Sequence, residues 1–133
     1  MKNRQSTILV VDDNATNLKL VSDLLEFEGY HILKAIDAEQ ARDVIRRSPP
    51  ALILMDIHLP GMDGITAFKH LKADPRTSKI PVIAVTASAM PNEREVIEAA
   101  GFEGYQSKPI SVKKLAAEVS RIIDAHPTPH MTD

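Results

Sequence analysis

Five side chains that can bind a cation or a phosphoryl group follow four short segments of strand length, three of them apolar, each at the point where the segment ends. They are Asp12 and Asp13 after residues 7–11, Asp56 after residues 52–55, Thr86 after residues 82–85, and Lys108 after residues 105–107. In a parallel α/β sheet the carboxyl ends of the strands meet at one edge, where ligands bind. The pattern therefore predicts three carboxylates, a hydroxyl and an ammonium in one crevice, which suits a divalent cation and a phosphoryl group.

Three carboxylates in one crevice need a counter-charge, because their mutual repulsion otherwise raises the pKa of at least one of them. Mg²⁺ is the predicted cofactor, since it accepts few protein carboxylates and keeps water and phosphate oxygens as its other ligands. A carboxylate in such a site can attack phosphorus and form an acyl phosphate. Asp56 is the predicted nucleophile because it ends the central strand, whereas Asp12 and Asp13 follow a neighbouring strand and suit metal binding.

The remaining polar groups fit phosphoryl transfer. Positive charge must offset the phosphoryl oxygens in the transition state, and Lys108 is predicted to supply it. Thr86 offers a hydroxyl hydrogen bond to the same oxygens, and the small Ala87 beside it leaves room for the phosphoryl group. Pro109 permits a cis peptide bond after Lys108, which is one way to direct the ammonium inward. We therefore predict Asp56, Lys108 and Thr86 as the catalytic residues.

Apolar segments of strand length alternate with segments of helical periodicity. The predicted strands span residues 7–11, 31–35, 52–55, 82–85 and 105–107. A helical segment follows each strand, the first of them from Asn14, and the residues predicted to cap three of the others are Asp37, Asn92 and Ser111. Five such units predict a single α/β domain, with five helices on the two faces of a doubly wound, five-stranded parallel sheet. We expect the flavodoxin-like strand order 2-1-3-4-5.

The composition is that of an ordinary globular protein, with 44% apolar and 26% charged residues among 133. A formal net charge of -2 and the lack of a basic stripe argue against a nucleic-acid partner, and without Cys there is no thiolate metal site. The polar N-terminus and short apolar runs predict neither a secretory signal nor a membrane helix, so we expect a cytoplasmic protein. We expect residues 1–125 to form the domain and the polar residues 126–133 to form a flexible tail.

These residues resemble the receiver domain of bacterial two-component response regulators. The resemblance rests on Asp12-Asp13, Asp56, residues 59–64, Thr86-Ala87 and Lys108-Pro109, and extends over residues 7–125. It implies a phosphorelay protein that accepts a phosphoryl group on Asp56 from a histidine kinase or a phosphotransfer protein. The phosphoryl group would then change the contacts with a downstream protein.

The resemblance also implies roles for further residues. Asp13, Asp56 and the backbone carbonyl of His58 would ligate Mg²⁺, with Asp12 acting through water. Thr86 and Tyr105 would form a coupled switch, in which the hydroxyl moves to the phosphoryl group while the ring turns inward. The surface around the fourth helix, fifth strand and fifth helix would then exchange partners.

Two surfaces are predicted to meet other proteins. The first helix beside the crevice would help to dock the phosphodonor; the residues predicted for this contact are Asn14, Asn17, Leu18 and Val21. The output surface departs from the family, which commonly has an apolar residue where this chain has Gln106-Ser107, so we expect a more polar output face. Residues 93–95 are predicted to form a solvated helix face, and the His58 imidazole is not expected to bind the hard cation.

Alternative hypotheses remain at this point. Only about eight residues follow the last helix, which favours a single-domain receiver without an output domain. The chain is alternatively a receiver fragment of a hybrid histidine kinase or multidomain regulator. A phosphatase of the haloacid dehalogenase type also forms an aspartyl phosphate, but it has Asp-x-Asp on its first strand, whereas Asp12 and Asp13 are adjacent. We expect self-catalysed chemistry on Asp56 rather than enzyme turnover, in a monomer or a weak phosphorylation-dependent dimer.

Overall fold

Five parallel strands form one sheet in the order β2-β1-β3-β4-β5, which confirms the predicted strand order. The computed structural model describes residues 6–59, 61–87 and 91–125. The elements are β1 (Thr7–Val11), α1 (Ala15–Phe27), β2 (His31–Ala35), α2 (Ala38–Arg47), β3 (Leu52–Asp56), α3 (Gly64–Ala73), β4 (Val82–Thr86), α4 (Pro91–Ala100), β5 (Gly104–Ser107) and α5 (Val112–Ala125). Residues 126–133, the predicted tail, lie outside the described residues.

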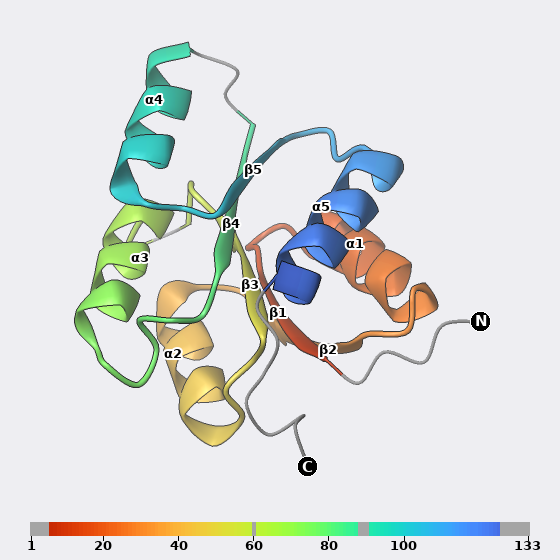
Figure 1. Cartoon of the computed structure of the whole chain (residues 1–133), viewed down its shortest axis with the longest axis horizontal. Helices are drawn as coiled ribbons and strands as arrows, with labels where there is room; N and C mark the ends of the chain where they lie inside the picture. The colour runs from red at the N-terminus through yellow and green to blue at the C-terminus, as the bar shows by residue number, and fades with distance from the viewer. Residues whose placement is uncertain (1–5, 60, 88–90, 126–133) are drawn as a thin grey trace.

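The strands are apolar on both faces because helices cover both sides of the sheet. Ile8 and Val10 of β1 pack on one side, in a core that includes residues of α1 and α5. The alternate residues Leu9 and Val11 pack on the other side, with residues of α2 and α3. Figure 1 shows the same division, with α1 and α5 on one side of the sheet and α2, α3 and α4 on the other. Burial on both faces is what a strand in the interior of a parallel sheet requires.

Side-chain caps begin four of the helices, and the cap predicted at Ser111 is confirmed, because its Oγ accepts the Lys114 N–H at 3.4 Å. The carboxylate or amide oxygens of Asn14, Asp37 and Asp63 accept hydrogen bonds from the backbone N–H three residues further on. These bonds satisfy donors that the first helical turn leaves without a partner. The predicted cap at Asn92 is wrong, since α4 already begins at Pro91 and Asn92 is its second residue. A proline suits the first helical position, because the N–H that it lacks has no partner there.

Asp63 stabilises the start of α3 by a bond that depends on pH. The N–H of Thr66 donates to its carboxylate at 2.8 Å, and this bond is the main cause of a lowered pKa of Asp63. A carboxyl whose pKa is lowered by folding adds stability above its unfolded pKa and loses it as the pH falls through the folded value. Asp63→Ala should therefore lower the free energy of unfolding by about 1 kcal/mol at neutral pH.

Urea denaturation at neutral pH and at about pH 3 checks this prediction. The difference between wild type and Asp63→Ala should shrink at the acidic pH. Asp43→Ala is the control, because Asp43 is an exposed helical residue and surface changes of this kind stay within about 0.5 kcal/mol. An Asp63→Ala difference that is the same at both pH values would contradict the assigned role of the carboxylate.

No helix among the described residues is long and apolar enough to span a bilayer. The longest are α5, with 14 residues, and α1, with 13. Both are amphipathic, and their buried apolar residues pack against the sheet.

Candidate functional site

Strand register brings the predicted site residues to one edge of the sheet. Val11 lies opposite Met55 in the β1–β3 pair, so the aspartates that follow each of them are neighbours. Thr86 lies opposite Ser107 in the β4–β5 pair, which places Lys108 beyond the same edge. Residues from opposite ends of the chain therefore converge, because parallel strands all end on the same side.

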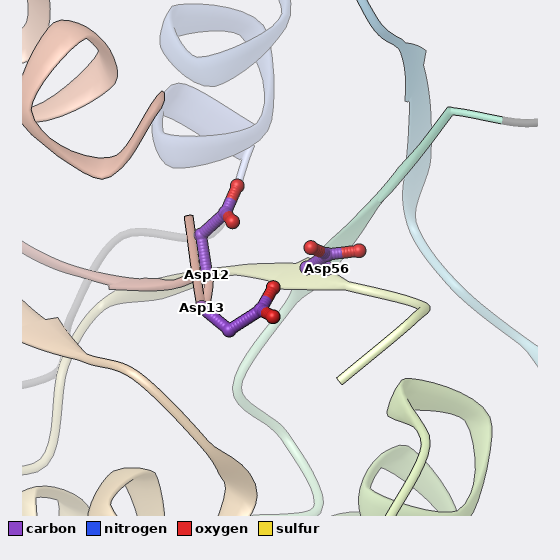
Figure 2. Close-up of side chains that lie close together, drawn as sticks. All are labelled: Asp12, Asp13 and Asp56. Carbon is purple, nitrogen blue, oxygen red and sulfur yellow. The ribbon is translucent and has the colours of Figure 1, made fainter. Parts of the chain in front are cut away.

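Three carboxyl groups cluster at this edge. One carboxylate oxygen each from Asp12, Asp13 and Asp56 lies within 4.8 Å of the others. Asp12 and Asp56 are buried, whereas Asp13 is exposed. In Figure 2 the Asp13 side chain extends from the end of β1 toward Asp56 at the end of β3. The cluster thus has two sheltered carboxylates and one that faces solvent.

Neighbouring donors orient the two buried carboxylates. The backbone N–H of His58 donates to Asp56 Oδ1 at 2.9 Å. The backbone N–H of Asn14 donates to Asp12 Oδ1 at 2.9 Å, and the side-chain amide of Asn17 donates to Asp12 Oδ2. Asn17, predicted as a docking residue, therefore also fixes a carboxylate of the site.

Lys108 bridges the two buried carboxylates. Its Nζ lies 3.1 Å from Asp56 Oδ2 and 3.2 Å from Asp12 Oδ2. The Lys108–Pro109 peptide bond is cis, and the Lys108 N–H donates to the backbone carbonyl of Thr86 at 2.8 Å. The ammonium thus supplies a fixed positive charge beside Asp56, where charge-assisted hydrogen bonds are strong.

The two partners of this ion pair titrate differently from free side chains. Burial raises the pKa of Asp56, and the nearby Asp12 charge acts in the same direction. The hydrogen bonds from His58 and Lys108 act against this rise and do not cancel it. Burial acts to lower the pKa of Lys108, but its hydrogen bond and charge interaction with Asp56, together with Asp12, leave that pKa raised. Lys108 is therefore a permanent cation, while Asp56 is a carboxylate that gains from a further positive charge.

Thr86 lies near the cluster, but its hydroxyl is bonded elsewhere. It is fully buried, and its Oγ1 donates to Glu93 Oε1 of α4 at 2.6 Å. The His58 ring nitrogen Nε2 lies 3.3 Å from the same hydroxyl and 3.7 Å from Glu93 Oε2. Sequence reasoning missed Glu93, because an acidic residue on a helix gives no local sign that its carboxylate meets a strand end.

The predicted solvated face over residues 93–95 is therefore only partly right. The Glu93 side chain is 24% exposed and faces Thr86, whereas Glu95 is exposed. The guanidinium of Arg94 lies 5.3 Å from the centroid of the Tyr105 ring, a cation–π contact that links α4 to β5. Tyr105, the predicted switch aromatic, is half-buried at this position.

Gln106 does not make the output face polar in the way predicted. Its side chain is buried, and its Nε2 donates to Glu118 Oε1 of α5 at 2.7 Å. The amide thus joins β5 to α5 beneath the surface, since a buried polar group needs a partner. Ser107 is exposed, so the polar contribution at this position comes from Ser107 alone.

Part of the predicted docking surface on α1 is wrong. Leu18 and Val21 are 8% and 3% exposed and pack in the core between α1, α5 and the sheet. Asn14 is exposed and Asn17 half-buried, so these two remain available at the surface. Leu20, at 54% exposure, is an apolar residue of α1 that does face outward.

The three-carboxylate cluster fits a hard divalent cation. Its donors are all oxygens, one carboxylate is open to solvent, and burial raises the pKa of another, Asp56, which a further positive charge would offset. Oxygen ligands with room for water are what Mg²⁺ requires. The His58 imidazole points toward Thr86 and Glu93, which leaves it outside this donor set.

Comparisons with known proteins agree with this geometry. Residues 8–120 match the family model described as the response regulator receiver domain. The chain is 45% identical over 108 residues to the polar-differentiation response regulator DivK of Brucella anthropi, covering 81% of this chain and 88% of that protein.

Solved structures show the same arrangement of elements. The receiver domain of a sensor histidine kinase from Pseudomonas aeruginosa, with a magnesium ion in its active-site cleft, has a TM-score of 0.82 and 32% identity, covering 91% of this chain and 99% of that one. The Vibrio cholerae chemotaxis protein CheY4 has a TM-score of 0.83 at 24% identity, covering 90% and 99%, a likeness of fold alone. With its strand order, carboxylate cluster and bridging lysine, the chain belongs to the receiver domains of response regulators, the proteins of phosphorelay signalling.

Proposed function

We propose that this protein accepts a phosphoryl group on Asp56 and that the modification changes its contacts with other proteins. The observation that carries the proposal is the buried Asp56 carboxylate, held 3.1 Å from the Lys108 ammonium within a cluster of three carboxylates. A buried carboxylate between a fixed cation and two acidic neighbours is suited to nucleophilic attack on a phosphoryl donor.

Asp56 and the groups around it have separate tasks in the proposed reaction. An Asp56 oxygen forms a bond to phosphorus while the bond from phosphorus to the leaving atom of the donor breaks, and the donor departs with that electron pair. The leaving atom is an imidazole nitrogen in a phosphohistidine donor and a carboxylate oxygen in acetyl phosphate. Lys108 balances the negative charge that spreads over the equatorial phosphoryl oxygens. The N–H of His58 keeps the carboxylate oriented, and burial limits access of water. The product is an acyl phosphate on Asp56.

Asp13 and Asp56 would hold Mg²⁺ directly, together with the His58 carbonyl, while Asp12 would act through water. When bound, Mg²⁺ neutralises the carboxylates and the phosphoryl oxygens. The Asp12 carboxylate already accepts hydrogen bonds from Asn14 and Asn17 and pairs with Lys108, which supports contact with the ion through water rather than directly. Asp13 is the exposed carboxylate of the cluster, which supports direct contact.

The test is phosphorylation by a small donor. Incubation with Mg²⁺ and acetyl phosphate should add the mass of one phosphoryl group per chain, measured by intact-protein mass spectrometry. Acetate leaves as the phosphoryl group is transferred. EDTA added before the donor should prevent the mass increase, because the acidic cluster then lacks its counter-charge. No added mass in the presence of Mg²⁺ would contradict the proposal.

We propose that Glu93 restrains the switch hydroxyl before phosphorylation. Thr86 donates to Glu93 and must exchange this bond for one to the phosphoryl group. Glu93→Ala removes a charged acceptor whose hydrogen bond stabilises the resting arrangement by about 1.5 kcal/mol. Phosphorylation by acetyl phosphate should therefore proceed up to about tenfold faster in this variant, since about 1.4 kcal/mol corresponds to a factor of ten.

Time courses of the phosphorylated fraction measure this effect. Glu95→Ala is the matched control, since Glu95 lies on the same helix and is exposed. The control should keep the wild-type rate. Equal rates for Glu93→Ala and wild type would show that the hydroxyl is not restrained by this bond.

Receiver domains interact with histidine kinases and downstream targets, and we propose specific surfaces for these contacts here. The start of α1 suits the phosphodonor, because Asn14 and Asn17 there are at least partly exposed and both donate hydrogen bonds to Asp12 of the cluster. The α4–β5–α5 side carries the Arg94–Tyr105 contact and suits the phosphorylation-dependent partner. We place the protein in the cytoplasm, as a signalling protein without enzymatic turnover and as a monomer or weak dimer.

A second candidate is the same receiver within a longer sensor kinase. The 32% identity to the receiver domain of a Pseudomonas aeruginosa sensor histidine kinase is the observation that favours it. The length of the open reading frame distinguishes them. The chemistry proposed for Asp56 is the same in both.

A further inference from the structure

A cavity of about 440 Å³ lies between α2 and α3, apart from the carboxylate cluster. Figure 1 shows these two helices on the same side of the sheet. The turn before α3 closes one end through Gly61 and Met62, and the segment after α3 closes another through Asp74 and Thr77. Clefts of roughly 300–1,000 Å³ are the size of small-molecule sites.

The floor of this cavity is apolar. Ala41 and Ile45 of α2, Met55 of β3 and Ala67 of α3 line it, and all four are buried core residues. The half-buried Leu71 adds to the same surface. An apolar floor of this kind favours the body of an aromatic or acyl ligand, because burying apolar area is the main source of binding free energy.

The rim carries unpaired positive charge. Arg42 and Arg46 stand one turn apart on α2, and neither has a carboxylate within 4.0 Å among residues 6–59, 61–87 and 91–125. The charge of Arg46 acts on Asp74 from a distance, but within the described part of the chain neither guanidinium group is held in an ion pair. Two adjacent exposed guanidinium groups of this kind provide forked donors that match a carboxylate or a phosphate.

Three carboxylates line the same rim, and each has its own surroundings. Asp74 is paired with Arg76 through two hydrogen bonds, of 3.1 and 3.3 Å. Asp37 accepts the N–H of Gln40 at the start of α2. Glu39 is the third rim carboxylate, so the acidic and guanidinium groups of the rim balance in formal charge. Among the described residues none of the three carboxylates lies within 4.0 Å of Arg42 or Arg46, so it is this adjacent pair of forked donors, rather than a net positive charge, that favours an anion.

We propose that this cavity binds a small amphipathic anion, with its apolar ring or chain on the Met55 floor and its carboxylate or phosphate between Arg42 and Arg46. The inference does not depend on phosphorylation of Asp56, since it concerns a separate cavity. Its test is therefore a binding measurement in unphosphorylated protein.

The experiment is a titration of ¹⁵N-labelled protein followed by ¹H–¹⁵N correlation spectra. The probes are 2-naphthoate, 2-naphthyl phosphate and the neutral 2-naphthamide. We expect saturable shifts of α2 and α3 amides with 2-naphthoate and a Kd of about 1 mM, an ordinary affinity for a ligand of this size. 2-Naphthamide should bind about tenfold more weakly, because it lacks the charge. Comparison of the two anions tells which head group the rim prefers.

Charge-removing variants complete the test. The double variant Arg42→Gln, Arg46→Gln should weaken 2-naphthoate binding about tenfold. Arg47→Gln is the control, since Arg47 is an exposed residue of α2 that does not line the cavity, and it should bind as wild type does. All three arginines are exposed, so the variants should fold, and unchanged spectra outside α2 verify this. No saturable shift for either anion, or equal binding of naphthoate and naphthamide, would overturn the proposal.

Discussion

Replacement of Asp56 by asparagine should abolish incorporation of the phosphoryl group from acetyl phosphate. The carboxamide introduced by Asp56→Asn is not a nucleophile of comparable strength, and of the two buried carboxylates beside Lys108 Nζ only that of Asp12 would remain. Asp12 is the nearest competitor, at 3.2 Å, but its oxygens already accept hydrogen bonds from Asn14 and Asn17. Intact-protein mass spectrometry should therefore show only unmodified protein.

The matched control for this result is Asp63→Asn. Asp63 belongs to the loop after β3 and caps α3 with its carboxylate, away from the ion pair. This variant should incorporate the phosphoryl group as wild type does. Persistent phosphorylation of Asp56→Asn would mean that another side chain accepts the phosphoryl group. Peptide mapping would then identify that side chain.

The second large effect is expected from Gly64→Ala, which should destabilise the fold. A Cβ built on Gly64 would lie 2.4 Å from the backbone oxygen of Asp56 and 2.8 Å from Cα of Ile57. Both neighbours are backbone atoms of the segment that holds the phosphoryl acceptor, so no side chain can rotate away. The N–H of Gly64 also donates to the Ile57 carbonyl at 2.8 Å and fixes this approach. We expect a loss of about 3 kcal/mol of unfolding free energy, since overpacking against a rigid neighbour costs this much.

Gly61→Ala provides the contrast. Gly61 has a φ of 78°, but nothing lies within 4 Å of a Cβ placed there. The substitution should cost only the conformational penalty of about 1 kcal/mol that a positive φ imposes on other residues. Urea denaturation of both variants measures the difference. Equal losses would mean that the backbone contact between α3 and the end of β3 yields more easily than the structure indicates.

The strands, their order and most helix starts could be predicted from the sequence. Apolar runs of four or five residues and the capping residues Asp37 and Ser111 act locally, so their pattern is visible in the chain itself. The third and fourth strands each run one residue further than predicted, to Asp56 and Thr86. Both residues continue the strand through parallel pairing with a neighbour, which is a contact between distant segments.

The polar residues of the site were also visible, because each directly follows a strand. The rule that parallel strands end at one edge is enough to bring Asp12, Asp13, Asp56 and Lys108 together. It says nothing about how they pair. Only the tertiary structure shows that Lys108 bridges two carboxylates and that, of the three aspartates, Asp13 is the one that faces solvent.

Residue types and spacing thus determined the fold class and the set of candidate residues, since both follow from short-range periodicity and from the ends of strands. The partner of the Thr86 hydroxyl, the burial of Leu18 and Gln106, and the cavity between α2 and α3 were decided by tertiary packing. Each depends on how the helices lie on the sheet and on one another. That arrangement is set by the fit of many side chains from separate segments, which no local pattern records.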